Sequence, residues 1–291
     1  AYSNTIFDAK GGNVHFEVTG DNILIEGITF RNFNFSGNGG VIYWGGNNGA
    51  LKNCNFINNT ATGDGGAVYW DGGKGTLTSS TFINNTANNW GGGAIRWNAA
   101  NGILTSSTFT GNTATRMDGG GVYWWGSNGS LSDSIFTNNS AVSVGGGVCW
   151  YGINGSLSDS IFTSNSANSG AGVYWNGADS TLSSSYFFNN SANDGGGIRW
   201  MGTNGVVNSC TFNGNIAVNV GGAIYWDVTG HMINSIFNGK WDKSNGIYAK
   251  TNLTITGGNG VVEIDNQGTL SGTSIVVLNN ETYYYPPDTN I

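Results

Sequence analysis

The chain has 291 residues, of which 50 are glycine and 43 are asparagine, and only 9% of its residues are charged. Ten basic residues against 17 acidic ones give a net charge of −7, which excludes nucleic-acid binding because phosphate contacts need clustered Lys and Arg. The scarcity of Ala, Leu, Glu and Lys excludes a mainly helical protein, while 38% hydrophobic and 13% aromatic residues exclude a disordered chain.

Residues 1–40 are predicted to form irregular first coils, because Val14, Phe16 and Val18 alternate as residues of a β-strand do. No basic-then-apolar signal peptide opens the chain. We therefore expect a mature chain, a fragment or an intracellular protein. No apolar run approaches the roughly 20 residues that a membrane-spanning helix needs, so we expect no transmembrane segment in this chain.

Residues 41–240 are predicted to form regular repeats of about 26 residues, because several residue types recur in phase. Tryptophan recurs at Trp44, Trp70, Trp97, Trp124, Trp150, Trp175, Trp200 and Trp226. Phenylalanine recurs at Phe30, Phe56, Phe82, Phe109, Phe136, Phe162, Phe187, Phe212 and Phe237. An asparagine follows three residues later at Asn59, Asn85, Asn112, Asn139, Asn165, Asn190 and Asn215. Another column reads Leu51, Leu77, Leu104, Leu131, Leu157, Leu182 and Val207. This pattern indicates a solenoid.

Three short strands per repeat are predicted, because apolar residues two apart, such as Val68 and Trp70, share one face of a strand. Gly, Asn, Asp and Ser separate these segments as turn formers, and no segment has room for a helix. A leucine-rich repeat needs several leucines per unit, and about one is present. The sequence therefore predicts an all-β, single-stranded parallel β-helix.

Two polar columns are interpreted as structural. The asparagines are expected to form a stacked amide ladder inside one turn. Cys54 and Cys210 occupy a column of serines that shares the phenylalanine face, and they lie too many coils apart to form a disulfide. With Cys149, the cysteines fit neither a disulfide framework nor a zinc site. We expect Cys54 and Cys210 to be buried free thiols.

The C-terminal part departs from the regular period. Residues 241–282 are predicted to form shorter coils or a cap, because the apolar segments continue at closer spacing. Residues 283–291 contain Pro286 and Pro287 and are interpreted as a linker or the start of a following segment.

The repeat resembles a known family. Phe56 to Asn59 followed by Gly65-Gly66-Ala67-Val68 looks like the repeat of chlamydial-type polymorphic outer-membrane proteins. It is still more similar to the repeats of adhesin-like surface proteins of methanogenic archaea. The resemblance implies a right-handed β-helix and a secreted or cell-surface protein that attaches to other cells, through their glycans or proteins or through copies of itself.

One column between the interior residues is the candidate ligand-binding surface. Because two arginines interrupt its tyrosines, the column is expected to lie on an exposed outer face of the sheet. Aromatic rings and guanidinium groups suit sugars and partner proteins. Stacked tyrosines that only stabilise the sheet through cross-strand pairing are the alternative. This Tyr/Arg column consists of Tyr43, Tyr69, Arg96, Tyr123, Tyr174, Arg199 and Tyr225, with Cys149 at one further position.

Candidate catalytic and metal-binding residues are few. Glycoside hydrolysis needs two facing carboxylates, and lyases of this fold use a basic residue with metal-binding acids. The two histidines, His15 and His231, lie about eight coils apart, and we expect no catalytic residues and no cofactor. Asp133 and Asp159 share a column on adjacent coils and are weak candidates for a structural calcium site. Asp64, Asp118 and Asp194 precede glycine runs and are interpreted as turn formers.

Nine Asn-x-Ser/Thr motifs fall mostly in predicted turns, which suits glycosylation of a secreted chain. A repeat rich in Asn and Ser also generates such motifs by itself. The candidate acceptors are Asn34, Asn58, Asn84, Asn128, Asn138, Asn154, Asn189, Asn252 and Asn280.

Three classes of function follow. The first is a non-catalytic extracellular adhesin-like protein that uses the Tyr/Arg column. The second is a structural stalk, or a subunit of a filament or surface layer. The third is a polysaccharide lyase or hydrolase, because parallel β-helices also carry such enzymes.

Overall fold

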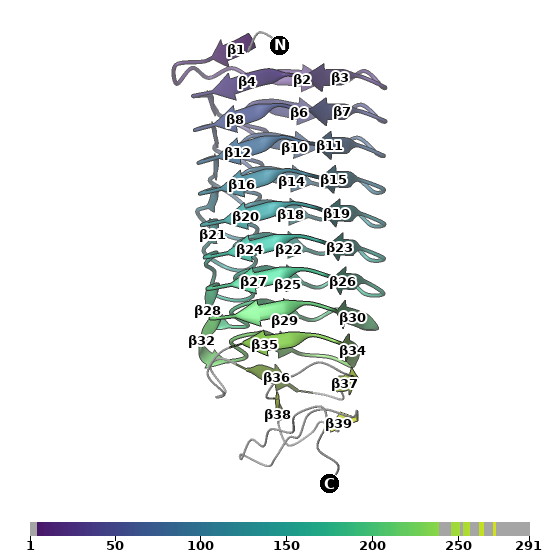
Figure 1. Ribbon diagram of the computed structural model, residues 1–291. Helices are drawn as coiled ribbons and strands as arrows, with labels where there is room; N and C mark the ends of the chain where they lie inside the picture. Colours follow the sequence, from purple (N-terminus) through teal and green to yellow (C-terminus); the bar gives the residue numbers. More distant parts are fainter. Residues whose placement is uncertain (1–4, 239–245, 251–252, 257–261, 265–269, 272–291) are drawn as a thin grey trace.

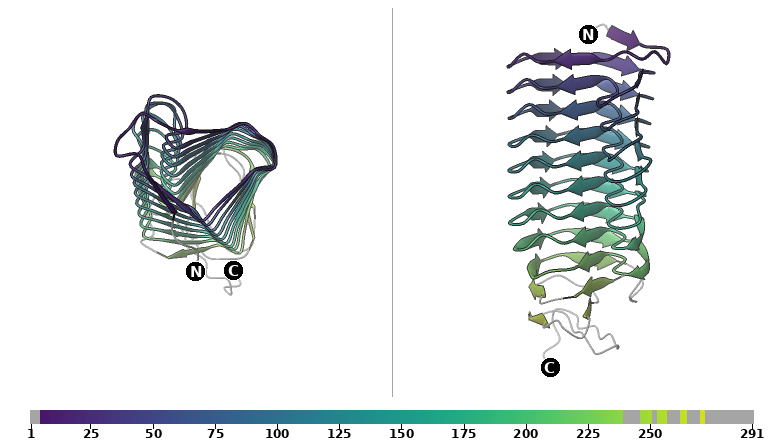
Figure 2. Two further views of the ribbon diagram at one scale, coloured as in Figure 1. Left: turned by 90° about the horizontal axis from the view of Figure 1, so that it is seen from above. Right: turned by 180° about the vertical axis from the view of Figure 1, so that it is seen from behind.

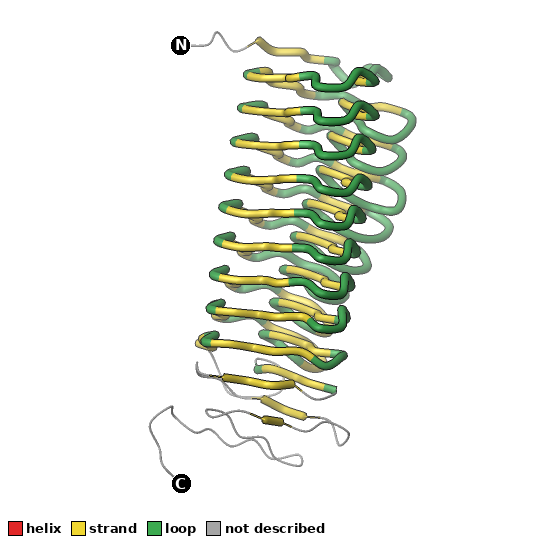
Figure 3. The backbone as a smooth tube through the Cα atoms, turned by 90° about the vertical axis from the view of Figure 1, so that its right-hand side faces the viewer, coloured by secondary structure: helices red, strands yellow, loops and turns green. Residues whose placement is uncertain are grey.

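The computed structural model describes residues 5–238, 246–250, 253–256, 262–264 and 270–271. Within these ranges the only regular structure is the β-strand (Figure 3), and the coils stack along one axis with β1 at one end and β36–β39 at the other (Figure 1). The predicted right-handed parallel β-helix, with about 26 residues per turn and three strands per coil, is confirmed.

The first sheet carries the phenylalanine column on its inner face, and we call it the Phe sheet. Its ten strands pair in parallel, like residue on like residue, as in Phe82↔Phe109. They are β1 (Thr5–Asp8), β4 (Ile28–Arg31), β8 (Asn55–Ile57), β12 (Thr81–Ile83), β16 (Thr108–Thr110), β20 (Ile135–Thr137), β24 (Ile161–Thr163), β27 (Tyr186–Phe188), β31 (Thr211–Asn213) and β35 (Ile236–Asn238).

The second sheet, the Trp sheet, places the tryptophans in register, as in Trp70↔Trp97. Its eleven strands are β2 (Phe16–Val18), β6 (Ile42–Trp44), β10 (Val68–Trp70), β14 (Ile95–Trp97), β18 (Val122–Trp124), β22 (Val148–Trp150), β25 (Val173–Trp175), β29 (Ile198–Trp200), β33 (Ile224–Trp226), β36 (Ile247–Ala249) and β38 (Val262–Ile264).

The third sheet, the Leu sheet, aligns the leucine column, as in Leu77↔Leu104. Its eleven strands are β3 (Leu24–Glu26), β7 (Ala50–Lys52), β11 (Thr76–Thr78), β15 (Ile103–Thr105), β19 (Ser130–Ser132), β23 (Ser156–Ser158), β26 (Thr181–Ser183), β30 (Gly205–Asn208), β34 (Gly230–Ile233), β37 (Leu253–Thr256) and β39 (Leu270–Ser271).

A fourth, shorter ladder, which the sequence did not predict, lies between the Phe sheet and the next strand of the Trp sheet. It is short because the chain must turn back within a few residues to start the next coil. Five of its strands pair in one run: β5 (Asn34–Phe35), β9 (Thr60–Ala61), β13 (Thr86–Ala87), β17 (Thr113–Ala114) and β21 (Ser140–Ala141). Isolated bridges of Ser166 to Ser140 and Ser191 lead to a separate pair, β28 (Ser191–Asp194) and β32 (Ile216–Val220).

The interior is a set of stacked side chains, as predicted. Successive tryptophan rings lie 4.5 to 5.3 Å apart between centroids, and the buried phenylalanine rings lie 4.7 to 5.1 Å apart. These distances follow the spacing of neighbouring strands, about 4.8 Å. Seen down the axis, successive coils lie over one another (Figure 2), so each coil buries its apolar residues against the next.

The predicted asparagine ladder is confirmed. Nδ2 of Asn112 donates to Oδ1 of Asn139 at 2.9 Å and to the carbonyl of Phe82 at 3.0 Å, and these side chains are fully buried. The serine column forms a second ladder, in which the amide of Ser107 donates to Oγ of Ser134 at 3.1 Å. Cys54 and Cys210 are buried free thiols, as predicted.

Candidate binding face

The Tyr/Arg column is the middle residue of the Trp-sheet strands from β6 to β33, with Cys149 in β22, in register from coil to coil, as in Tyr69↔Arg96↔Tyr123. Its members lie outside the hydrophobic core cluster, which agrees with the outward orientation inferred from the arginines. The expectation of an exposed face is wrong, however. Tyr123 and Tyr225 are only 5% exposed, and the other tyrosines and both arginines are half-buried.

The loop that precedes each strand of the Trp sheet accounts for this burial. Gly119 has a φ of +65°, and a Cβ there would lie 2.9 Å from Cα of Tyr123. Gly170 stands in the same relation to Tyr174. Glycine is therefore required at both positions, by the left-handed backbone and by the close approach. The loop packs against the column and covers part of it.

A second outward column, two residues after the first, was missed by the sequence analysis. Its backbone amides continue the ladder: the N–H of Trp125 donates to the carbonyl of Trp97 and that of Tyr151 to Trp124, both at 2.7 Å. The rule that residues two apart share a face could have identified it. Its members are Asp71, Asn98, Trp125, Tyr151, Asn176, Met201, Asp227 and Lys250.

The two columns together form a cluster of aromatic rings midway along the solenoid, which we call the aromatic patch: Tyr123, Trp125, Tyr151 and Tyr174. Tyr151 lies 5.4 Å from Trp125, 5.5 Å from Tyr123 and 6.1 Å from Tyr174, measured between ring centroids. Trp125 runs nearly parallel to Tyr123, at 6° and 6.3 Å. Trp125 is 53% exposed, so the patch presents an indole to solvent above a buried tyrosine.

On the N-terminal side of the patch, Arg96 contacts three side chains. Its guanidinium lies over the ring of Tyr123, 4.3 Å from the centroid. Nη1 lies 3.3 Å from Oδ2 of Asp64, and Nε donates to Oδ1 of Asn98 at 2.9 Å. Asp64, interpreted as a turn former, lies in a bend. Its carboxylate also accepts a hydrogen bond from the backbone N–H of Trp90 at 2.7 Å and pairs with an arginine on the next coil.

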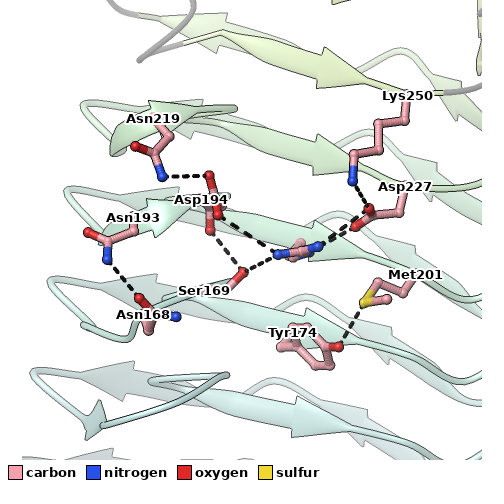
Figure 4. Close-up of polar contacts among 10 residues, drawn as sticks. Asn168, Ser169, Tyr174, Asn193, Asp194, Met201, Asn219, Asp227 and Lys250 are labelled. Carbon is pink, nitrogen blue, oxygen red and sulfur yellow. Dashed lines mark hydrogen bonds and ion pairs between the residues drawn. The ribbon is translucent and has the colours of Figure 1, made fainter. Parts of the chain in front are cut away.

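On the C-terminal side, Arg199 is the centre of a second network, and its partners Ser169, Asp194 and Asp227 are labelled in Figure 4. Its Nε donates to Oδ2 of Asp227 at 2.8 Å and its Nη1 to Oγ of Ser169 at 3.2 Å, while Asp194 lies 3.9 Å away. Lys250 donates to the other oxygen of Asp227 at 3.1 Å. Asp194, too, contributes to an ion-pair network rather than only to a turn.

Asp118 and Cys149 lie beneath the patch. Burial raises the pKa of Asp118, and hydrogen bonds from Ser143, Val144 and Tyr151 offset part of that shift. Burial also raises the pKa of the Cys149 thiol well above its ordinary value. Because the thiolate is the reactive form of cysteine, this shift favours an unreactive, buried thiol at Cys149.

The candidate calcium ligands, Asp133 and Asp159, are both exposed and both adopt a left-handed bend with φ of 51°. Asp133 accepts a hydrogen bond from Oγ of Ser132 at 2.8 Å. Calcium usually takes six to eight oxygen ligands, and the described part of the chain contains no group of three or more His, Cys, Asp or Glu side chains that could hold a metal ion.

A cavity of about 350 Å³ lies at the N-terminal end of the same face, lined by His15, Glu17, Phe35, Asn38, Tyr43 and Thr19. The ring of His15 stacks on Phe35 at 3.6 Å, and the hydroxyl of Tyr43 donates to Asp71 at 2.8 Å. The first member of the Tyr/Arg column therefore borders a cavity instead of the aromatic patch.

Seven of the nine candidate glycosylation acceptors lie in the described residues, and all seven are exposed. Six adopt a left-handed backbone at turns; Asn34 begins a short strand. Asn252 and Asn280 lie outside the described residues. The exposed set is Asn34, Asn58, Asn84, Asn128, Asn138, Asn154 and Asn189.

Stacked coils with these interior ladders define a β-helix repeat protein. Its repeat matches the Chlamydia polymorphic membrane protein repeat at residues 53–69, 79–96 and 209–225. This confirms the resemblance to that repeat, and the narrower likeness to methanogen adhesins stays a prediction. No curated protein matches the chain. Among the described residues, no helix has the length and hydrophobicity that a membrane crossing requires.

Two solved structures share the fold. One is the complex of the alginate lyase AlyF-OU02 with G6, with a TM-score of 0.55 at 12% identity, covering 92% of this chain and 59% of the lyase chain. The other is a tailspike protein of E. coli bacteriophage HK620 in complex with a pentasaccharide, with a TM-score of 0.50 at 13% identity, covering 92% and 58%. This chain therefore spans less than two thirds of either protein.

Proposed function

We propose that this chain is a non-catalytic binding module of an extracellular, adhesin-like surface protein, and that its contact face is the outward side of the Trp sheet. The observation that carries the proposal is the aromatic patch, where Trp125 is 53% exposed. Exposed tryptophan and tyrosine on a rigid support are the residues that dominate binding energy at interfaces. The match to a polymorphic membrane protein repeat supports a surface protein.

Attachment is tested by measuring how purified chain, immobilised on beads, binds to cells and to surfaces coated with cell-envelope extracts. Trp125→Ala is expected to reduce attachment roughly tenfold, because the indole supplies most of the exposed aromatic area of the patch. Trp90→Ala is the matched control, since Trp90 is 56% exposed and makes no ring contact with the patch. Equal attachment by both variants would contradict the proposal.

An enzyme acting on polysaccharides is the alternative that the lyase and tailspike folds suggest. The carboxylates around the patch support the non-catalytic proposal. Asp118 is buried and accepts hydrogen bonds from Ser143, Val144 and Tyr151, while Asp64 pairs with Arg96 and Asp227 pairs with Arg199 and Lys250. Incubation with alginate and other polysaccharides is expected to release neither reducing ends nor unsaturated uronates. Release of either product by the wild-type chain, and not by a patch variant, would establish catalysis.

Self-assembly into a stalk or filament is favoured by one observation. The first coil exposes apolar side chains at the open end of the solenoid, including Ile6 (49%), Phe7 (40%) and Leu24 (57%), and an unpaired strand edge there is a template for further pairing. Light scattering over a range of protein concentrations tests this: a mass that grows with concentration supports assembly, and a constant mass opposes it.

A further inference from the structure

We propose that the aromatic patch is a binding site for a neutral oligosaccharide, with the sugar rings lying over Trp125 and Tyr151 along the solenoid axis. The inference rests on the proposed binding function and specifies its ligand class. The apolar faces of sugar rings match exposed indole and phenol rings, which offer large, rigid surfaces at little cost in conformational entropy.

The patch is extended in the direction that an oligosaccharide chain requires. Tyr123 and Trp125 come from one coil, Tyr151 from the next and Tyr174 from the one after that, so the rings span two strand spacings, about 10 Å. The centroid distances from Tyr151 to Trp125 and Tyr174, 5.4 and 6.1 Å, show a continuous surface instead of separate rings.

The patch is held in place before any ligand arrives. Trp125 lies parallel to Tyr123, whose ring is buried and has the Arg96 guanidinium over one face. The hydroxyl of Tyr174 is directed at the sulfur of Met201, 2.7 Å away (Figure 4). Because these side chains are already ordered, they lose little conformational entropy when a ligand binds.

A polar group suited to sugar hydroxyls stands beside the rings. Asn176 follows Tyr151 in the second outward column; its side chain is exposed and forms no hydrogen bond with any described residue. A side-chain amide both donates and accepts, as hydroxyl groups require. Asn98, on the other side, is already committed to Tyr69, Asp71 and Arg96.

The charges around the patch favour a neutral ligand over an acidic one. Both guanidinium groups that border it are neutralised, Arg96 by Asp64 at 3.3 Å and Arg199 by Asp227 at 2.8 Å. A uronate carboxylate would therefore find no free arginine in either column, and it would approach a chain with a net charge of −7. Arg116, on the loop before β18, is exposed and is therefore included in the test.

The test is titration calorimetry of the full chain with neutral hexasaccharides (hexamers of glucose, mannose and N-acetylglucosamine) and with uronate hexamers. A neutral hexamer is expected to bind best, and raising the salt from about 0.05 to 0.5 M should change its Kd less than twofold because no ion pair forms. Trp125→Ala should weaken binding at least tenfold, Trp125→Phe less, and Trp90→Ala not at all. Thermal unfolding verifies that each variant is folded.

Two results would overturn the inference. One is uronate binding that is tighter than neutral binding and is abolished by salt or by Arg116→Ala. The other is neutral binding that Trp125→Ala leaves unchanged. If no hexamer binds while Trp125→Ala still abolishes attachment to cells, the ligand class is wrong and the binding function stands; if attachment is also unaffected, the proposed function fails as well.

Discussion

Asn139 and Asn165 are joined by two hydrogen bonds to a single acceptor: both Nδ2 and the backbone N–H of Asn139 donate to Oδ1 of Asn165, each at 3.0 Å. The other Nδ2 proton of Asn139 goes to the carbonyl of Phe109 at 3.0 Å, and its own Oδ1 accepts from Asn112. Every polar atom of this buried side chain is therefore satisfied, which only an amide can achieve.

Replacing Asn139 with Asp should destabilise the protein strongly. The carboxylate keeps the acceptor but loses both side-chain donors and places a charge in a buried ladder, which costs about 3 to 5 kcal/mol. The neighbouring Asn138 is exposed and has a φ of +55°, a conformation that Asp also tolerates. Asn138→Asp should therefore cost less than about 0.5 kcal/mol.

The measurement is urea unfolding of unglycosylated protein followed by tryptophan fluorescence. A similar loss in both variants would show that the amide ladder contributes no more than the turn conformation beside it.

The ladders were predictable from sequence because each coil repeats the environment of the last, so one residue type recurs wherever one contact is required. The fold, the stacked Trp, Phe and Asn columns and the buried thiols of Cys54 and Cys210 follow from that periodicity. The partial burial of the Tyr/Arg column was not predictable from the sequence, because it depends on the path of the loop before each strand. The pairing of Arg96 with Asp64 joins a strand to the preceding coil's loop, and no spacing rule encodes it.

Gly129 packs against the indole of Trp124 and should not tolerate a methyl group. A Cβ at Gly129 would lie 2.4 Å from Nε1 of Trp124, and that indole is fully buried and donates to the carbonyl of Gly126 at 3.0 Å. Gly129→Ala should cost about 2 kcal/mol or more through overpacking. At Gly45 the nearest atom to a new Cβ is 3.6 Å away, so Gly45→Ala should be nearly neutral. Thermal unfolding compares the two, and an equal fall in Tm would contradict the assigned contact.

Asp227 should contribute more to the free energy of unfolding than Glu26, which forms a more exposed ion pair. Its side chain is 9% exposed and bonds to both Arg199 and Lys250. Asp227→Asn leaves the half-buried guanidinium with Asp194, 3.9 Å away, as its remaining counter-charge, and should cost about 2 kcal/mol. Glu26 is 27% exposed and pairs with Lys52, itself 51% exposed. Glu26→Gln should cost less than about 1 kcal/mol. Urea unfolding at low and high salt distinguishes them, since only the exposed pair is screened.

Stability should fall as the pH rises above about 9, because buried thiols and phenols hold their protons more tightly in the folded chain. Burial raises the pKa of Cys210 from its ordinary 9.0 to about 12 and that of Tyr174 from 10.0 to about 12. The unfolded chain loses these protons first, so the stabilisation is complete below the unfolded pKa and is lost as the pH rises through the window up to the folded pKa. Each such group then lowers the free energy of unfolding by up to about 1.4 kcal/mol per pH unit.

Cys210→Ser isolates one of these contributions. The column already holds serine at neighbouring coils, where Oγ of Ser185 donates to the carbonyl of Ser183 at 2.7 Å, so the variant should fold with the wild-type structure. Urea titrations between pH 9 and 11 give its free energy of unfolding at each pH. This free energy should decline less steeply than that of the wild type, by up to about 1.4 kcal/mol per pH unit, the contribution of one titrating group. If the two slopes coincide, the Cys210 thiol does not titrate on unfolding in this range, and the alkaline sensitivity must come from the tyrosines and the other buried thiols, Cys54 and Cys149.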